Sequence, residues 1–545
     1  MPKQANVRTF DSGTIILFLF LCTGPFVHGF MFESELAGAA IVVLFGFLVF
    51  LLRARLRGDI ILYLLLALTV LYAASVGYGA DRHESLLSLL KVSLLAPLYV
   101  FVRAVSATVM ARIWEAWTWL LGLSVPISIA ADRFVDGRLA GFIDYANGYA
   151  ILLLVGVLIA YGLAAAASPS IRRNLLQIPI FLGAAGTYLT ESRTVLVLLF
   201  ASFAVLYFLK GRAHRMLWLR TSSSVALGLI AGVMYGWLPW LVLPVAAIFM
   251  LLYRIPESET SKRAVRISLL VVSPLLGTGA IWFGSGMADR WSAIASRTGE
   301  GATRLVYYRD AWMMFMDSPL WGFGAGAWMY MQYHYQTAAY FTAYIHSQPL
   351  QVMTETGVFG LLLFIGICVF LVGRCLSSAR RNEGVHSDFD AVRGIACCVL
   401  LVHSLVDFTL SFPYLLGLLI IIGTAPANTP IVKTNAAKAI SAVPIVAKFV
   451  AALAAASLLT VATLLFISDR LQQSAVRAIA EQRKADAVDL LDRSAKMAIF
   501  ADRIYDRKAR LYLSEFESGG DRRYLDVARD ENKKGAVAPP RTNLV

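Results

Sequence analysis

Long apolar runs separated by short polar connections dominate this chain of 545 residues. A run of about 20 mostly apolar residues is long enough to cross a bilayer as a helix. Such runs recur along most of the chain, for example at 36–52, 59–77, 144–167, 357–373 and 447–467. The pattern predicts an all-α, polytopic membrane protein with about 12 to 15 transmembrane helices.

The composition supports this class and excludes others. Hydrophobic residues make up 58% of the chain and charged residues 15%, against about 25% charged residues in ordinary soluble domains. The net charge of +14 is spread between the apolar runs, which favours membrane topology and anionic lipid or substrate over nucleic acid. The five cysteines lie in or beside apolar runs without zinc-type spacing, so we expect neither a disulfide framework nor a structural zinc.

The basic residues predict an orientation. The first apolar run begins near Thr14 and has no credible cleavage site, so we interpret it as a retained helix after a cytoplasmic N-terminus. Alternate connections are then rich in Lys and Arg, as expected on the cytoplasmic side. This register requires two separate spans, 217–234 and 237–253, joined at Gly236. If they formed one re-entrant element, everything after them would change side.

The register divides the chain into four parts. Residues 1–286 and 351–468 are transmembrane helices, 287–350 form a long extracytoplasmic loop, and 469–545 form an extracytoplasmic tail. A loop of this size is far longer than the usual 4 to 6 residues or so and is typical of a functional segment. In the tail, the amphipathic stretch 471–513 predicts a helical hairpin, while the polar residues 518–545 are expected to be disordered.

The long loop has three recognisable segments. RLVYYRDAWMMFM at 304–316 predicts an amphipathic helix at the membrane surface. The following DSPLWGFGAGAW breaks that helix, and its glycines predict a turn, since GFGAG lacks the Lys and Ser/Thr of a phosphate-binding loop. AYIHSQPLQVMTETG at 343–357 is unusually polar for this chain and is expected to return to the membrane at about Gly357.

These segments carry a family resemblance. RLVYYRDAW, PLWGFGAG and IHSQPLQVMTETGVFG, in this order, resemble the signature of the O-antigen ligase and O-antigen polymerase superfamily, which includes protein O-oligosaccharyltransferases. RLAGFIDYANGYAILL, TESRTVLVLL and HSLVDFTLSFPYLLG are similar to further segments of that family, and the whole resemblance covers roughly residues 130–420. The Gln-Pro pair at 348 and 349 departs from the polar pair often found there, which bears on acceptor contacts.

The resemblance implies a GT-C-like membrane glycosyltransferase of the bacterial cytoplasmic membrane, with its active site on the outer face. Its donor would be an undecaprenyl diphosphate-linked glycan, and its acceptor a hydroxyl of a lipid, glycan or protein. We expect an inverting ligase without cofactor or metal. A repeat-unit polymerase and a protein O-oligosaccharyltransferase are enzyme alternatives. A transporter of the lipid-linked sugar is the non-enzyme alternative, but the internal repeats it predicts are not seen.

A diphosphate leaving group needs fixed cations, and arginine stays protonated and donates paired hydrogen bonds to phosphate oxygens. The matching segments nominate Arg193, Arg304, Arg309 and Arg138. Two alternatives stay open at the sequence level. Arg193 can reach the headgroups or pair with Glu191, and Arg304 and Arg309 can anchor an interfacial helix to lipid phosphates.

The acceptor hydroxyl needs a base that is neutral near pH 7, which suits histidine. Among the histidines expected on the outer side, His346 alone matches the family segment, so we predict that it is the general base. The alternative is a cap for the helix starting near Gln348. Glu355 either orients His346 or packs at the outer end of the next helix.

Three further residues are site candidates: Asn147, which has two alternative roles, and His403 and Asp407, which rank below the others. Asn147 can bind a sugar hydroxyl or join neighbouring helices. His403 and Asp407 are spaced i, i+4 and are predicted to share one helical face, either as a functional pair or as a structural hydrogen bond.

A metal-dependent enzyme would instead have Asp81 and Glu84 of ADRHE as its acidic ligands.

Overall fold

The computed structural model describes residues 12–53, 57–167, 170–211, 214–237, 239, 242–243, 245–247, 249, 298–381, 385–426 and 441–535. Over these residues the chain is almost entirely helical, which confirms the predicted all-α class. The strands in this part of the chain are two-residue pieces. β1 (Arg57–Gly58) pairs antiparallel with β4 (Ser441–Ala442), and β2 (Phe134–Val135) with β3 (Arg138–Leu139).

Eight helical stretches in the described ranges are long and apolar enough to cross a membrane. They include every run given above as an example, and shorter apolar helices lie beside them. The stretches are α2 (Glu33–Arg53), α3 (Ile60–Tyr78), α4 (Arg82–Ser93) with α5 (Leu95–Ala104), α6 (Ala107–Ala130), α7 (Ala146–Ala166), α11 (Arg215–Trp237), α17 (Gln348–Arg381) and α20 (Ile445–Ala480). The total of 12 to 15 stays a prediction, because most of the second span expected at 237–253 lies outside the described residues.

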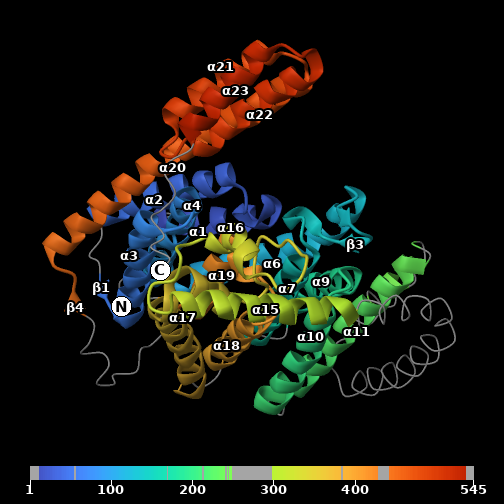
Figure 1. Cartoon of the computed structure of the whole chain (residues 1–545). Helices are drawn as coiled ribbons and strands as arrows, with labels where there is room; N and C mark the ends of the chain where they lie inside the picture. The colour runs from blue at the N-terminus through green and yellow to red at the C-terminus, as the bar shows by residue number, and fades with distance from the viewer. Residues whose placement is uncertain are drawn as a thin grey trace.

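The remaining helices fill the bundle or lie at its ends. They are α1 (Ser12–Thr23), α8 (Ile171–Leu175), α9 (Gln177–Leu189), α10 (Arg193–Leu206), α15 (Thr298–Asp317), α16 (Ala327–Tyr335), α18 (Val385–Ser404), α19 (Pro413–Gly423), α21 (Lys484–Met497), α22 (Asp502–Gly519) and α23 (Arg522–Gly535). Short 3₁₀ or π turns cover Gly24–Phe26, His28–Phe30, Gly141–Ile143, Tyr207–Gly211 and Thr409–Ser411. The predicted helix at 304–316 is confirmed within α15, which lies across the bundle in Figure 1.

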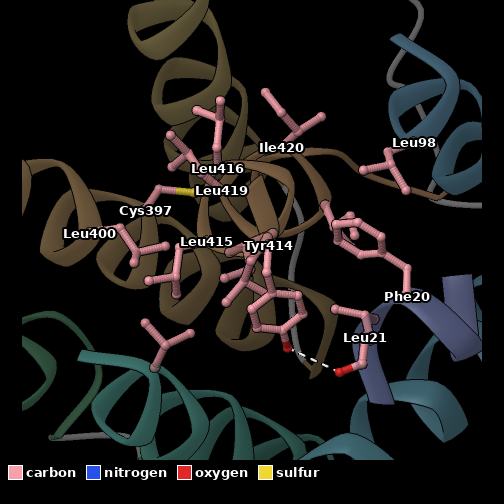
Figure 2. Close-up of a cluster of buried hydrophobic side chains, with 14 of the residues drawn as sticks. Phe20, Leu21, Leu98, Cys397, Leu400, Tyr414, Leu415, Leu416, Leu419 and Ile420 are labelled. Carbon is pink, nitrogen blue, oxygen red and sulfur yellow. Dashed lines mark hydrogen bonds between the residues drawn. The ribbon is translucent and has the colours of Figure 1, made fainter. Parts of the chain in front are cut away.

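The centre of the bundle is formed by α7 and α19. Every residue of α19 is buried, and so is almost all of α7. A helix that is apolar on all sides is expected in such a position. Figure 2 shows Tyr414 of α19 among side chains from α1 and α18, with its hydroxyl donating to the Leu21 carbonyl oxygen (3.0 Å). That hydroxyl also accepts from the indole N–H of Trp117 on α6 (2.7 Å), so the polar atom of the buried ring is satisfied.

A break inside α17 is closed by the GFGAG turn. Gly357 has φ +66° and ψ −161°, which interrupts the helix and leaves carbonyl groups before it without helical partners. The N–H groups of Phe323 and Gly324 donate to the carbonyl oxygens of Thr354 (2.9 Å) and Glu355 (3.0 Å). The glycines of GFGAG therefore serve a tight backbone contact, in agreement with the predicted turn.

The tail begins within α20, whose 36 residues exceed the length needed to cross a bilayer. Figure 1 shows α21, α22 and α23 grouped beyond one end of the bundle. Ala475, Leu491 and Ile504 form a small core between α20, α21 and α22.

The disordered end predicted from residue 518 is wrong over 522–535, which form α23, whereas 536–545 lie outside the described residues. The polar composition of this segment did not indicate that α23 packs against α22. Lys508 of α22 is buried and pairs with Asp492 (2.5 Å) and Glu531 (3.2 Å), which attaches α23 to the tail.

Gly357→Ala should destabilise the protein by at least about 1–3 kcal/mol, the usual cost of a strained backbone position. An added Cβ would lie 2.2 Å from the Leu320 carbonyl oxygen, and the positive φ disfavours any L side chain. Gly373→Ala in the same helix is the matched control, because an added Cβ there meets nothing within 4 Å. The measurement is the thermal midpoint of the detergent-solubilised protein. Equal midpoints for the two variants would contradict the role given to this break.

Candidate active site

Polar side chains from four separate segments meet around Asp407, which follows α18. Its Oδ2 atom accepts hydrogen bonds from the Tyr145 hydroxyl (2.7 Å) and the Asn147 side-chain N–H (3.0 Å) at the start of α7. Arg304 of α15 places Nη2 3.9 Å from the same oxygen. Asp407 is almost fully buried, so these partners compensate for the removal of its charge from water.

The prediction that His403 and Asp407 share one helical face is wrong. α18 ends at Ser404, and the N–H groups of Leu405 and Val406 bond three residues back to Val402 and His403, which closes the helix in a tight turn. Asp407 therefore lies beyond the helix. His403 is buried and its Nδ1 is 3.1 Å from the Thr409 hydroxyl, which is the kind of structural hydrogen bond considered above.

Two of the four predicted arginines join this cluster. Arg304 donates from Nη1 to the Val406 carbonyl oxygen (2.7 Å). Arg138 of β3 donates from Nη2 to the Asn147 side-chain oxygen (2.7 Å) and from Nε to the Thr190 carbonyl oxygen (2.9 Å). Arg138, Asn147, Asp407 and Arg304 thus form one continuous network, which we call the Asp407 network. A guanidinium has five N–H donors, so these contacts do not exhaust either arginine.

Arg193 and Arg309 lie apart from this network. Both side chains are exposed, and Arg193 is the first residue of α10. Among the described residues no hydrogen bond or ion pair connects either of them to Asp407. Arg193 follows closely on Thr190, whose carbonyl binds Arg138, so its backbone position is near the network. Arg309 is five residues from Arg304 on α15 and therefore points from a different side of that helix.

His346 lies beside the Asp407 network in a strained conformation. Its φ of +48° is in the left-handed region, which is uncommon for residues other than glycine. The Tyr308 hydroxyl of α15 donates to its carbonyl oxygen (2.8 Å), and the Phe408 ring packs edge-on against its imidazole with centroids 4.8 Å apart. The buried Nδ1 atom has no hydrogen-bond partner among the described residues, so the ring does not cap the helix that begins at Gln348.

The surroundings lower the pKa of the imidazole. Burial lowers the pKa of His346, the carboxylate of Asp407 raises it and the guanidinium of Arg304 lowers it again, and the net pKa is below the usual value. The buried Oδ1 of Asp407 also lacks a partner among the described residues. An unsatisfied buried polar atom costs about 1–3 kcal/mol. Two such atoms at one site indicate a position where a ligand or water completes the hydrogen bonding.

Glu355 is connected to the His346 segment only indirectly, through Gln351. Its Oε1 accepts from the Gln351 side-chain N–H (2.7 Å), and the Gln351 oxygen accepts from the Ile345 backbone N–H (3.1 Å). The Tyr72 hydroxyl of α3 donates to the other carboxylate oxygen (2.8 Å). Glu355 is buried. In this structure it supports the backbone next to His346 and does not touch the imidazole.

Several contact residues were not identified from the sequence. Tyr145, Tyr308 and Phe408 lie within the family-like segments, but no role was assigned to them. Tyr308 follows Arg304 by four residues, so the i, i+4 rule could have placed both on one stripe of α15. Phe408 packs against Tyr145 (4.6 Å between centroids) and Tyr344 (5.0 Å), contacts that sequence spacing does not reveal.

The acidic pair considered for a metal has another partner. Asp81 and Glu84 form ion pairs with Arg503 of α22 at 2.7 Å and 2.8 Å. In the described ranges, no group of three His, Cys, Asp or Glu side chains is arranged to hold a metal ion. Both carboxylates are thus paired with the same arginine of the tail.

The apolar helices and the partly buried cluster of Arg304, Asp407 and His346 are consistent with a multi-pass membrane protein that carries a polar site. The O-antigen ligase family model matches residues 238–365, which include Arg304, Tyr308, His346 and Glu355. This match confirms the predicted resemblance to the O-antigen ligase superfamily over that segment. No curated protein matches the chain. Arg138, Asn147 and Asp407 reach the site from outside the matched segment.

The pKa of His346 can be measured by carbethoxylation, because only the neutral imidazole reacts. Peptide mass spectrometry at a series of pH values should give a midpoint below about 6.5, the usual histidine value. In Asp407→Asn the midpoint should fall further, since the carboxylate raises the pKa. The exposed His334 is the internal reference. A midpoint for His346 above that of His334, or an upward shift in Asp407→Asn, would contradict the electrostatics described here.

Proposed function

We propose that the protein is a glycan ligase that transfers an undecaprenyl diphosphate-linked oligo- or polysaccharide to an acceptor hydroxyl at the outer face of the bacterial cytoplasmic membrane. The match to the O-antigen ligase family supports a membrane glycosyltransferase of this general type. The observation that carries the proposal is the position of a strained histidine with a lowered pKa beside an ion pair between the half-buried Arg304 of α15 and the buried Asp407 after α18.

In the proposed reaction, the acceptor oxygen attacks the anomeric carbon and loses its proton to the His346 imidazole. The bond between that carbon and the diphosphate oxygen breaks, and the diphosphate leaves with the bonding electron pair. Attack from the face opposite the leaving group inverts the anomeric centre. A histidine with a lowered pKa is unprotonated at neutral pH and is available as the base.

The cations would stabilise the charge that develops on the departing diphosphate. Arg304 is the first of these, because it is half-buried beside Asp407 and keeps donors free. Arg138, which is fixed by Asn147 and Thr190, would be the second. The exposed Arg193 and Arg309 would meet the diphosphate or the headgroups as the donor enters. Asn147 would contribute by fixing the positions of Arg138 and Asp407 relative to each other through its hydrogen bonds.

The acceptor decides between the ligase and its two enzyme alternatives, because the donor chemistry is shared. Purified protein in lipid is given undecaprenyl diphosphate-oligosaccharide together with a lipid, a glycan or a protein acceptor, and release of undecaprenyl diphosphate is followed. Release with a lipid acceptor supports the ligase. Release that requires a second donor molecule or a protein would identify the polymerase or the protein glycosyltransferase. Movement of donor across vesicles without release would identify a transporter.

His346→Ala should lower kcat by about 10²- to 10⁴-fold, the usual contribution of a general base. His334→Ala is the matched control, because His334 is exposed on α16 and lies outside the Asp407 network. Full turnover by His346→Ala would exclude the base. Turnover abolished by a chelator and restored by a divalent ion would instead favour the metal-dependent alternative.

Arg304→Gln should lower kcat by about 10²- to 10³-fold, as expected when one group that stabilises a developing negative charge is removed. Arg82→Gln, at an exposed arginine on α4, makes the same change in charge away from the network. Initial rates at saturating donor are compared after correction for folded protein. Equal losses in the two variants would show that net charge, and not the position of Arg304, controls the rate.

A further inference from the structure

Arg503 joins the tail to the rest of the protein with three side-chain hydrogen bonds. It lies on α22 and donates from Nη1 to Glu84 (2.8 Å) and from Nη2 to Asp81 (2.7 Å) and the Tyr330 hydroxyl (2.7 Å). Its guanidinium also lies over the Tyr330 ring, 5.7 Å from the centroid. The side chain of Asp81 is 11% exposed and that of Arg503 33%, so this is a partly desolvated network and not an isolated surface pair.

The two carboxylates that bind Arg503 belong to the segment that supports the GFGAG turn. The Ala80 N–H donates to the Phe323 carbonyl oxygen (2.9 Å), and the Ser85 hydroxyl is 3.1 Å from the Ala325 carbonyl oxygen. Gly326 packs so closely on Glu84 that an added Cβ would lie 2.4 Å from the Glu84 Cβ. The position of the turn therefore depends on the position of Glu84.

From the turn, hydrogen bonds lead to the backbone beside His346. The Gly326 N–H donates to Glu355 (3.3 Å), which binds Gln351, which in turn accepts from the Ile345 N–H. A second route runs through α16. Tyr330 contacts Arg503, and two other α16 side chains, Trp328 and Gln332, each donate to the Thr342 carbonyl oxygen (3.1 Å). Both routes end on the segment that carries His346.

We propose that Arg503 is a positioning residue for glycan transfer, through which the C-terminal helices hold the His346 segment in its productive geometry. This inference rests on the function proposed above. His346 has a left-handed backbone, which persists only where surrounding contacts fix it. The routes from Arg503 provide such contacts at two backbone positions shortly before His346, Thr342 and Ile345.

The ion pairs of Arg503 persist under neutral assay conditions. Burial raises the pKa of Asp81, but Arg503 and the Glu84 N–H lower it, and the net pKa is below the usual value. A depressed carboxylate pKa means that the contact is present above the ordinary Asp value and is lost only as the pH falls through the lowered one. Turnover can thus be measured near pH 7 with the tail attached.

The test compares Arg503→Gln with Arg510→Gln in the full-length protein, reconstituted in lipid. Arg510 lies on the same helix, is exposed and pairs only with Asp506 among the described residues. Arg503→Gln should lower kcat by about 10- to 100-fold, as expected for misplacement of a catalytic group by about 1 Å, with the donor KM unchanged. Arg510→Gln should have the kcat of the unmodified protein. Arg503→Lys, which keeps the charge but loses the fork, should recover part of the rate.

A double-mutant cycle examines the same contact. Glu84→Gln should also lower kcat, and the variant with both changes should lose no more than Arg503→Gln alone, because the two residues act through one interaction. A merely structural contact would lower the thermal midpoint of Arg503→Gln and leave kcat per folded molecule intact. That result would overturn the inference. Full additivity in the cycle would overturn it as well.

The outcomes separate this inference from the proposed function. If His346→Ala is inactive while Arg503→Gln has full kcat, the proposed function stands and the positioning role is wrong. If the unmodified protein releases no undecaprenyl diphosphate with any acceptor, the proposed function fails. If His346→Ala retains full turnover, His346 is not the base, and the positioning role fails with it. If Arg503→Gln is not monodisperse in detergent, Arg503→Lys and Glu84→Gln are measured in its place. Full kcat in both of these variants would overturn the inference.

Discussion

Backbone groups in an apolar bundle have no water to bond, so every interruption of a helix needs a partner from the protein. The break of α17 at Gly357 is the main case, and the rest of the site depends on it. The GFGAG turn supplies N–H groups to the carbonyls freed by the break, and the Val358 N–H donates to the Pro319 carbonyl oxygen (2.8 Å). Because the turn is fixed to the helix in this way, α15 and α16 on its two sides are fixed as well.

The second organising feature is the burial of Asp407 against Arg304, Tyr145 and Asn147. A buried carboxylate is stable only with nearby cations and hydrogen-bond donors, and its partners come from segments far apart in the chain. Tyr145 reaches it across 262 residues, and Arg304 contacts the adjacent carbonyl across 102. The same charges tune His346, so the position of Asp407 affects both the fold and the proposed base.

The sequence predicted the features that depend on local pattern. Long apolar runs predicted the spans at α2, α3, α7, α17 and α20. The amphipathic pattern predicted the helix over 304–316, and the glycines predicted the GFGAG turn. Predictions failed where a distant contact decided the outcome. Asp407 is turned off its helix to meet α7, and α23 is stabilised by Lys508 of the neighbouring helix despite its polar sequence. The φ of His346 also depends on contacts such as Tyr308, which no local rule supplies.

The length of α20 links the tail to the bilayer itself. At 1.5 Å per residue its 36 residues extend about 54 Å, nearly twice the hydrocarbon thickness of about 30 Å. The helix is attached beyond its apolar part, where Asp469 accepts from the Ser34 N–H (3.0 Å). A membrane of different thickness changes the tilt of such a helix. Lipid composition therefore affects the geometry of this protein, because the tilt of α20 determines how far α22 lies from the bilayer.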